Sequence, residues 1–343
     1  MLQLDDLAAA ETKSDRSMRW ATAARVAAAV FLAGVAAIIG ARWLTGTGYV
    51  AAPPGLPDAG QLTAIGLPIT HLAGEAAAVV VSGLLMMMWM APKRVSSAND
   101  RRLAVLASRW SWVWAGSALA WMVFTMSDMT GLPVTQLPSS PDLIVVVSGT
   151  QRILAQMATL WIAVAVALFA GRLSGRVATV TVSCLVLLAL LPSALSGHAG
   201  HHNETAVTVG ALAIHIVAAA LWIGGLLAIV MYLRHEPDRL VAVLPRFSTI
   251  ALLCAASVAV SGVIVSVVLL GSWAALLDSN RGHLIAAKGA ALALLVMIGY
   301  WHRRTSMVSA AGGRLRPLLR LAGVELLLMG ATMGVAVALS TTA

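Results

Sequence analysis

Six side chains that carry or can carry a charge lie inside long apolar stretches of the sequence. They are His71, Glu75, Arg152, His215, Lys288 and Glu325. Removing such a group from water is costly, so each one is a reason to expect a function. The sequence contains no Walker A, nucleophile-elbow or HExxH motif. We therefore expect imidazole-based metal binding or proton transfer, and no enzyme.

His71 and Glu75 are four residues apart, which places them on one face of a helix. A carboxylate beside a histidine could orient the imidazole as a second-shell partner of a metal, or take its proton. The alternative interpretation is a polar pair that caps a helix beginning just after Pro68.

His215 lies about ten residues into its apolar segment and precedes a Gly224-Gly225 pair, where a neighbouring helix can approach closely. Together with His71 it predicts a metal site made by two helices near the outer face. Two such imidazoles could instead be the axial ligands of a b-type haem. A third interpretation is a histidine that only donates a hydrogen bond to a helix carbonyl.

Further side chains could act as copper ligands: His198, His201, His202, Met122, Met126, Met129 and His283. Three loop histidines within five residues suit the capture of a borderline metal such as copper. The methionines share one helix face, and thioethers suit Cu(I). A solvated loop and methionine packing remain the alternatives. Lys288 and Glu325 are expected to hold a metal ligand in place or to relay protons. Copper binding needs neutral imidazole, so we expect it to weaken below about pH 6.5.

The elements that carry these residues are predicted to be membrane-spanning helices. The chain is 59% hydrophobic and 11% charged, whereas soluble domains carry about 25% charged residues. Apolar runs of roughly 20 residues recur, and in lipid only a helix satisfies their backbone. The predicted spans are 21–41, 68–90, 110–129, 143–170, 177–195, 206–233, 247–270, 284–301 and 318–339. This pattern predicts an all-α, multi-pass protein of the bacterial plasma membrane.

Basic residues gather in alternate connections, beginning with Lys13, Arg16 and Arg19. By the positive-inside rule, the N-terminus is cytoplasmic and the C-terminus faces outward. We divide the chain into a tail (1–20), a five-helix region (21–204) and a four-helix domain (205–343). The similar segments 104–111 and 242–248 suggest one helix followed by two parallel four-helix repeats. Chance similarity of basic-aromatic helix starts is the alternative.

The C-terminal part, from about residue 212, resembles the CopD copper resistance family. The resemblance is carried by His215, Ala220 to Gly225, Arg246-Phe247-Ser248, Ser261-Gly262, Gly282, Lys288, Arg303-Arg304 and Glu325. It implies an inner-membrane protein that moves or hands over copper, often beside a periplasmic copper-binding partner of the CopC type. The rival functions are a haem-binding electron carrier and a scaffold for cytochrome oxidase assembly that transports nothing.

Overall fold

The computed structural model describes residues 2–53, 55–90, 97–140, 143–173, 175–192, 206–270, 280–311 and 316–341. In that part of the chain every regular element is a helix. The long helices are α1 (Leu2–Thr45), α2 (Gly60–Met90), α3 (Ser97–Thr130), α5 (Gln151–Phe169), α8 (Ala206–Met231), α9 (Pro237–Leu270), α11 (Asn280–Ala311) and α12 (Arg316–Thr341). The shorter ones are η1 (Val134–Ser139), α4 (Leu143–Gly149), η2 (Ala170–Arg172), α6 (Arg176–Leu188) and η4 (Leu233–His235). The predicted all-α class is confirmed.

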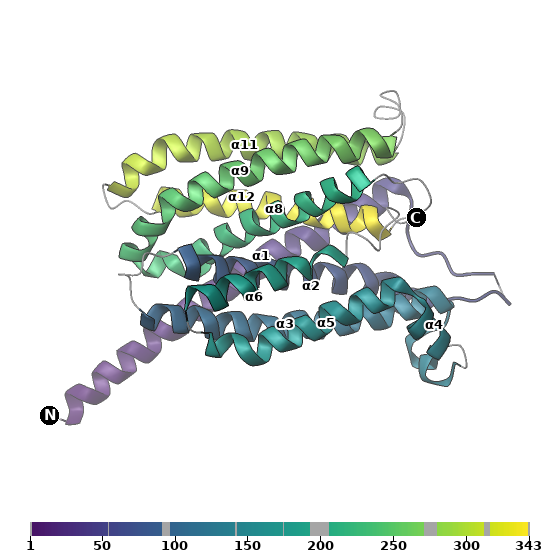
Figure 1. The fold of residues 1–343 in the computed structure, drawn as a ribbon, viewed down its shortest axis with the longest axis horizontal. Coiled ribbons are helices and arrows are strands. Elements are labelled where there is room, and N and C mark those ends of the chain that lie inside the picture. The colour runs from purple at the N-terminus through teal and green to yellow at the C-terminus, as the bar shows by residue number, and fades with distance from the viewer. Residues whose placement is uncertain are drawn as a thin grey trace.

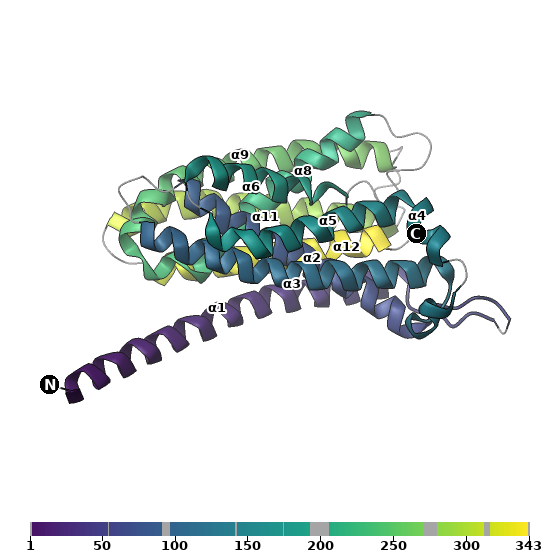
Figure 2. The same ribbon diagram turned by 60° about the horizontal axis from the view of Figure 1, so that its bottom comes forward.

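The helices form one elongated bundle in which the two chain ends lie at opposite ends (Figure 1). Figure 2 shows the first part of α1 projecting from the bundle at the N-terminal end. Among the described residues, seven helices are long and apolar enough to cross a membrane. They are α1, α2, α5, α8, α9, α11 and α12, with α5 counted together with η2. The chain is a multi-pass membrane protein.

The other two predicted spans fall on α3 and α6. Helix α3 packs against both α2 and α5 inside the bundle, but its tryptophans, serines and charged residues lower its hydropathy. Helix α6 has 13 residues in the described part, which is fewer than a span needs. The count of nine spans therefore stays a prediction.

Helix α2 is the central element of the bundle. In its span 78% of residues are buried, against 11% in α11, which lies on the periphery. It packs against α3, α6 and α8, and more lightly against α1, α9 and α12. Polar side chains on α2 are therefore removed from both water and lipid.

The crossing of α2 and α8 brings two backbones into direct contact. A Cβ atom on Gly83 would overlap the backbone of Gly224, and a Cβ on Gly224 would overlap that of Val79 and Gly83. Small residues allow this approach between membrane helices. At this crossing, α2 from the N-terminal half of the chain contacts α8 from the C-terminal half.

Two arginines of α9 hold the last turn of α2. Arg239 donates to the carbonyl of Met87 at 3.1 Å and to Asp100 Oδ1 at 2.7 Å. Arg246 donates to the carbonyl of Met90 at 2.6 Å. The last carbonyls of a helix have no partner within it, and cationic side chains suit this negative end of the helix dipole. The α9 arginines therefore cap α2.

The start of α2 corrects one interpretation of the sequence. The helix begins at Gly60 and continues through Pro68, so His71 and Glu75 lie in its interior and do not cap its start. Proline has no N–H, which leaves the carbonyl four residues earlier, that of Ala64, without its helical donor. Arg42, at the end of α1, donates to this carbonyl at 2.7 Å. A side chain from a neighbouring helix thus replaces the missing hydrogen bond.

The predicted span 143–170 is also corrected. Helix α4 ends at Gly149, and Thr150 has an extended backbone before α5 begins. The carboxyl-terminal glycine and the β-branched residue after it favour this break. Residues 151–172 alone form the candidate span.

Candidate metal site in the bundle

His71 is buried on the central helix, with 6% of its surface exposed. Its Nε2 lies 3.2 Å from Oε1 of Glu75, one turn further along α2. The distance is that of an ion-pair contact, but the angles fall outside those of a hydrogen bond, so both ring nitrogens lack a hydrogen-bond partner. A buried polar atom in this state calls for a water or an ion.

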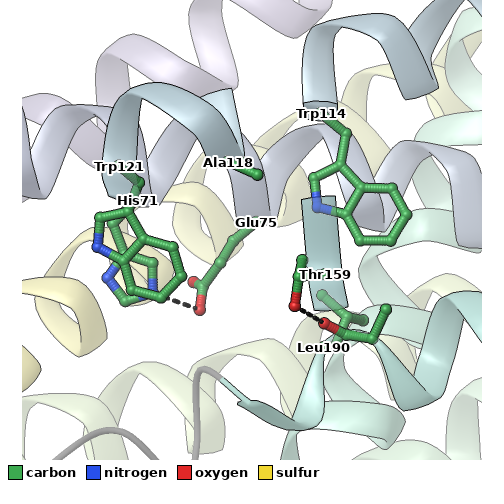
Figure 3. A pocket seen from close by; sticks show the side chains of 9 residues that line it. His71, Glu75, Trp114, Ala118, Trp121, Thr159 and Leu190 are labelled. Carbon is green, nitrogen blue, oxygen red and sulfur yellow. Dashed lines mark hydrogen bonds and ion pairs between the residues drawn. The ribbon is translucent and has the colours of Figure 1, made fainter. Parts of the chain in front are cut away.

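Trp121 of α3 covers one face of the imidazole. The two ring centroids are 4.1 Å apart and the planes differ by 4°, so the rings are stacked (Figure 3). Trp121 is itself 6% exposed, and its Nε1 has no hydrogen-bond partner. Sequence analysis missed this residue because no spacing relates a tryptophan on one helix to a histidine on another.

A small cavity opens beside the pair (Figure 3). Its walls include His71, Glu75, Trp121, Trp114 and Thr159. It offers about 20 Å³ to the centre of a water molecule, which is room for one or two waters. A haem macrocycle is far larger than this space.

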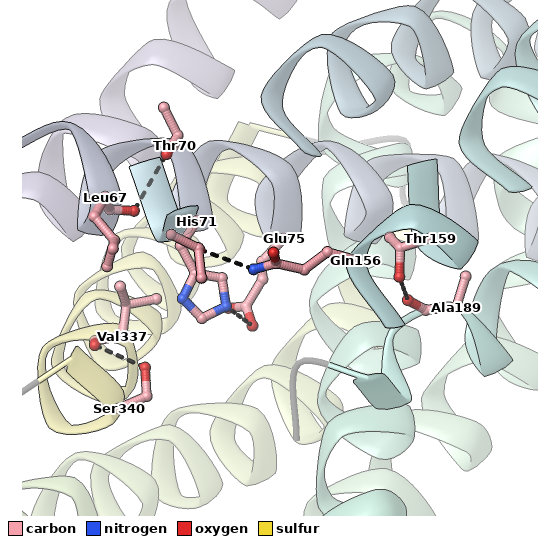
Figure 4. A network of polar contacts seen from close by, with 10 residues as sticks. Leu67, Thr70, His71, Glu75, Gln156, Thr159, Ala189, Val337 and Ser340 are labelled. Atoms are coloured by element: carbon pink, nitrogen blue, oxygen red, sulfur yellow. Dashed lines mark hydrogen bonds and ion pairs between the residues drawn. The ribbon is translucent and has the colours of Figure 1, made fainter. Parts of the chain in front are cut away.

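Polar contacts tie the helices around the cavity together (Figure 4). Gln156 of α5 donates to the hydroxyl of Thr125 on α3 at 3.0 Å. Thr159 donates to the carbonyl of Ala189, which follows α6, at 3.0 Å. The Oε1 atom of Gln156 is buried without a partner. The site is therefore held by α3, α5 and the end of α6 as well as by α2.

The geometry of Glu75 favours one tautomer of His71. A proton on Nε2, the nitrogen 3.2 Å from the carboxylate although outside hydrogen-bond angles, leaves the lone pair on Nδ1, and Nδ1 has no hydrogen-bond partner. Histidines that bind a metal usually donate their second N–H to a carboxylate or carbonyl in this way. The donor set of His71 thus fits a metal ligand.

His215 lies in a different environment. Its Nδ1 is 3.1 Å from the hydroxyl of Ser261 on α9, and the ring edge faces Gly262. Among the described residues, no hydrogen bond, ion pair or ring contact joins His215 to His71. His71 stacks on a residue of α3, and His215 contacts a residue of α9. A metal site shared by the two imidazoles stays a prediction.

Lys288 of α11 interacts electrostatically with both groups. Its positive charge interacts favourably with the carboxylate of Glu75 and unfavourably with a protonated His215. Its side chain is partly exposed.

The remaining predicted ligands lie elsewhere. Met126 is buried in an apolar cluster with Leu137 and Ile153, against which Met157 also packs. Met129 is 44% exposed, and His283 is exposed on α11.

Glu325 is buried on α12. His198, His201 and His202 lie outside the described residues. Within the part of the chain that the structure describes, no three His, Cys, Asp or Glu side chains form a group that could hold a metal ion.

Comparison with known proteins identifies two family domains in the chain. The model described as "Copper resistance protein D-like, N-terminal domain" matches residues 62–207, and that described as "Copper resistance protein D" matches residues 241–339. Copper transport protein CutJ of Bacillus subtilis (strain 168) is 28% identical over 118 residues, which are 33% of this chain and 22% of that protein. The matched segment thus spans about a fifth of that relative. No solved structure matches. The chain belongs to the copper resistance protein D family of membrane proteins.

Proposed function

We propose that this protein binds copper inside a bacterial plasma membrane and moves it or hands it over. Copper is the substrate, taken up at the extracytoplasmic face. The observation that supports this most directly is His71, whose Nδ1 is buried without a partner while its Nε2 faces Glu75. The family match and the name of the Bacillus relative point to the same metal.

In this proposal the ligands act in sequence. His198, His201 and His202 capture copper outside, and a periplasmic protein of the CopC type is the candidate donor. His71 and His215 then serve as two successive intramembrane stations, with Met126, Met129 and His283 as secondary ligands. Glu75 orients His71, while Lys288 and Glu325 relay protons or balance charge. We propose two stations because His71 stacks on Trp121 of α3 whereas His215 contacts Ser261 of α9.

Metal analysis of the purified protein tests the intramembrane stations. His71→Ala and His215→Ala should each lower the bound copper, and the double variant should abolish the intramembrane fraction. His235→Ala is the matched control, because His235 lies in η4, beyond the end of α8. This variant should leave the copper content unchanged. Unchanged stoichiometry in the double variant would remove the intramembrane sites from the proposal.

Two further measurements separate the rival functions. A Soret band in the absorption spectrum of the purified protein would favour a haem carrier, although the cavity at His71 has room for only one or two waters. Copper flux into proteoliposomes distinguishes a transporter from an assembly scaffold, because a scaffold gives no flux.

A further inference from the structure

The stacking of Trp121 on His71 places an aromatic face beside any metal that the imidazole binds. The planes differ by only 4° and the centroids are 4.1 Å apart. Both rings are buried, and both line the same small cavity. The indole is therefore a fixed wall of the site.

Elementary coordination geometry gives the position of the metal relative to this wall. A metal on imidazole lies in the ring plane, about 2.0 Å from the nitrogen. Because the two planes are nearly parallel, such a metal lies level with the imidazole and beside the indole face, roughly 4–6 Å from the indole centroid according to the ring nitrogen that holds it. A cation within about 6 Å of an aromatic centroid is attracted to the ring.

The other donors near His71 are few. Glu75 faces Nε2, and the cavity has room for only one or two waters. No second imidazole, thiol or carboxylate completes a three-residue group in the described part of the chain. Cu(II) prefers a square-planar or tetragonal set of nitrogen and oxygen ligands, whereas Cu(I) is the soft ion that accepts softer partners. Among the described residues, one imidazole, one carboxylate and one indole face with little water supply fewer nitrogen and oxygen donors than the square-planar set that Cu(II) prefers.

We propose that Trp121 is a specificity-determining residue that makes the His71 site select Cu(I) over Cu(II). This inference rests on the proposed function, since it names the oxidation state of the copper bound at that same site. Trp114 lines the opposite part of the cavity but does not stack on His71. It therefore provides a matched control within the same pocket.

Affinity measurements on the full-length purified protein test the inference. The probes are Cu(I) under reducing conditions, Ag(I) as a redox-inert monovalent ion, and Cu(II) in air, each against a competing chelator. Trp121→Leu should lower the affinity for Cu(I) and Ag(I) roughly tenfold more than that for Cu(II). Trp121→Phe, which keeps a flat aromatic ring, should retain most of the preference. Trp114→Phe should leave the ratio of the affinities unchanged.

A spectroscopic measurement guards against effects on folding. Ag(I) should change the indole emission of the unsubstituted protein, and this change should disappear in Trp121→Phe and persist in Trp114→Phe. An equal loss of Cu(I) and Cu(II) binding in Trp121→Leu would show that the ring only packs, and would overturn the inference while leaving the copper site intact. Absence of any copper binding by the unsubstituted protein would overturn the proposed function and this inference together.

Discussion

Glu75 acts on the candidate site through a single contact, its carboxylate 3.2 Å from Nε2 of His71. Outer partners of this kind fix the orientation and tautomer of a ligating histidine. The carboxylate, whose side chain is 25% exposed, also places a negative charge beside any cation on the buried ring. Its role is therefore separable from that of the ligand itself.

Replacing Glu75 should weaken copper binding without removing the site. We expect Glu75→Ala to lower the affinity about 10- to 100-fold, because the imidazole loses the partner that holds its tautomer. Glu75→Gln keeps an amide oxygen or nitrogen beside Nε2 but removes the negative charge, and should lose less. Chelator competition measures both. Equal affinities in all three proteins would mean that Glu75 does not orient His71.

Backbone carbonyls of α2 that lack a donor within the helix accept hydrogen bonds from arginine side chains of other helices. The interior Pro68 leaves the Ala64 carbonyl open, and Arg42 of α1 fills it at 2.7 Å. The end of α2 is held in the same manner by Arg239 and Arg246. Both ends of the central helix thus depend on arginines outside it.

A double-mutant cycle measures the coupling free energy between Arg42 and Pro68. Arg42→Met should lower the free energy of unfolding by roughly 1–3 kcal/mol, since a buried carbonyl loses its donor. In a Pro68→Ala background, residue 68 supplies its own N–H to Ala64 and the same substitution should cost less. Thermal unfolding in detergent gives the four values. Strict additivity would show that Arg42 acts elsewhere, for example through its contact with the Thr47 carbonyl.

The connection between α1 and α2 carries a second, exposed interaction with a pH signature. Tyr49 donates to Asp58 Oδ2 at 2.6 Å. This hydrogen bond raises the pKa of the Tyr49 phenol above its ordinary value and, with the bond from the Gly60 amide, lowers the pKa of Asp58. Because the pKa of Tyr49 is raised in the folded protein, the stabilisation that its hydrogen bond to Asp58 gives the fold is complete below pH 10.0. This stabilisation is lost as the pH rises through the pKa of the folded state.

Absorbance of the phenolate reports this titration directly. The difference between the unsubstituted protein and Tyr49→Phe should show a midpoint above the ordinary phenol value of 10.0. Asp58→Asn should move the midpoint downward, since the carboxylate that favours the neutral phenol is gone. A midpoint that does not move would mean that the two side chains do not interact in solution.

At the scale of the whole molecule, one of the contacts between the two halves is the packing of α1 against α12, and another is the crossing of α2 and α8 at Gly83 and Gly224. No side chain separates the backbones at this point. A side chain added there must push the helices apart, and overpacking of this kind costs about 1–3 kcal/mol or more.

Gly83→Leu should therefore destabilise the protein by at least about 3 kcal/mol, and Gly224→Leu likewise. Gly116→Leu and Gly210→Leu are matched controls on α3 and α8, because a Cβ at either position meets nothing within 4 Å. Loss of the monodisperse peak in size-exclusion chromatography and a lower Tm in detergent are the readouts. Equal behaviour of all four variants would place the contact between α2 and α8 elsewhere.

Much of the architecture follows from the sequence, because long apolar runs leave helices as the sole solution in lipid. The helix face shared by His71 and Glu75 follows from their spacing, and the structure brings these two side chains to 3.2 Å. The stacking of Trp121, the continuation of α2 through Pro68 and the break at Thr150 do not follow. Each depends on contacts between helices, which periodicity within one helix does not encode. For the same reason, spacing could not reveal that His71 and His215 face different helices.

The capping of α2 by α9 has a consequence for the order of synthesis. Met87 and Met90 leave the ribosome about 150 residues before the arginines that hold their carbonyls, at separations of 152 and 156 residues. Until Arg239 and Arg246 emerge, the last carbonyls of the central helix lack these donors, although its neighbour α8 has already been synthesised. Nascent chains halted before residue 237 should accordingly be sensitive to proteolysis, and those halted after residue 270 should be resistant.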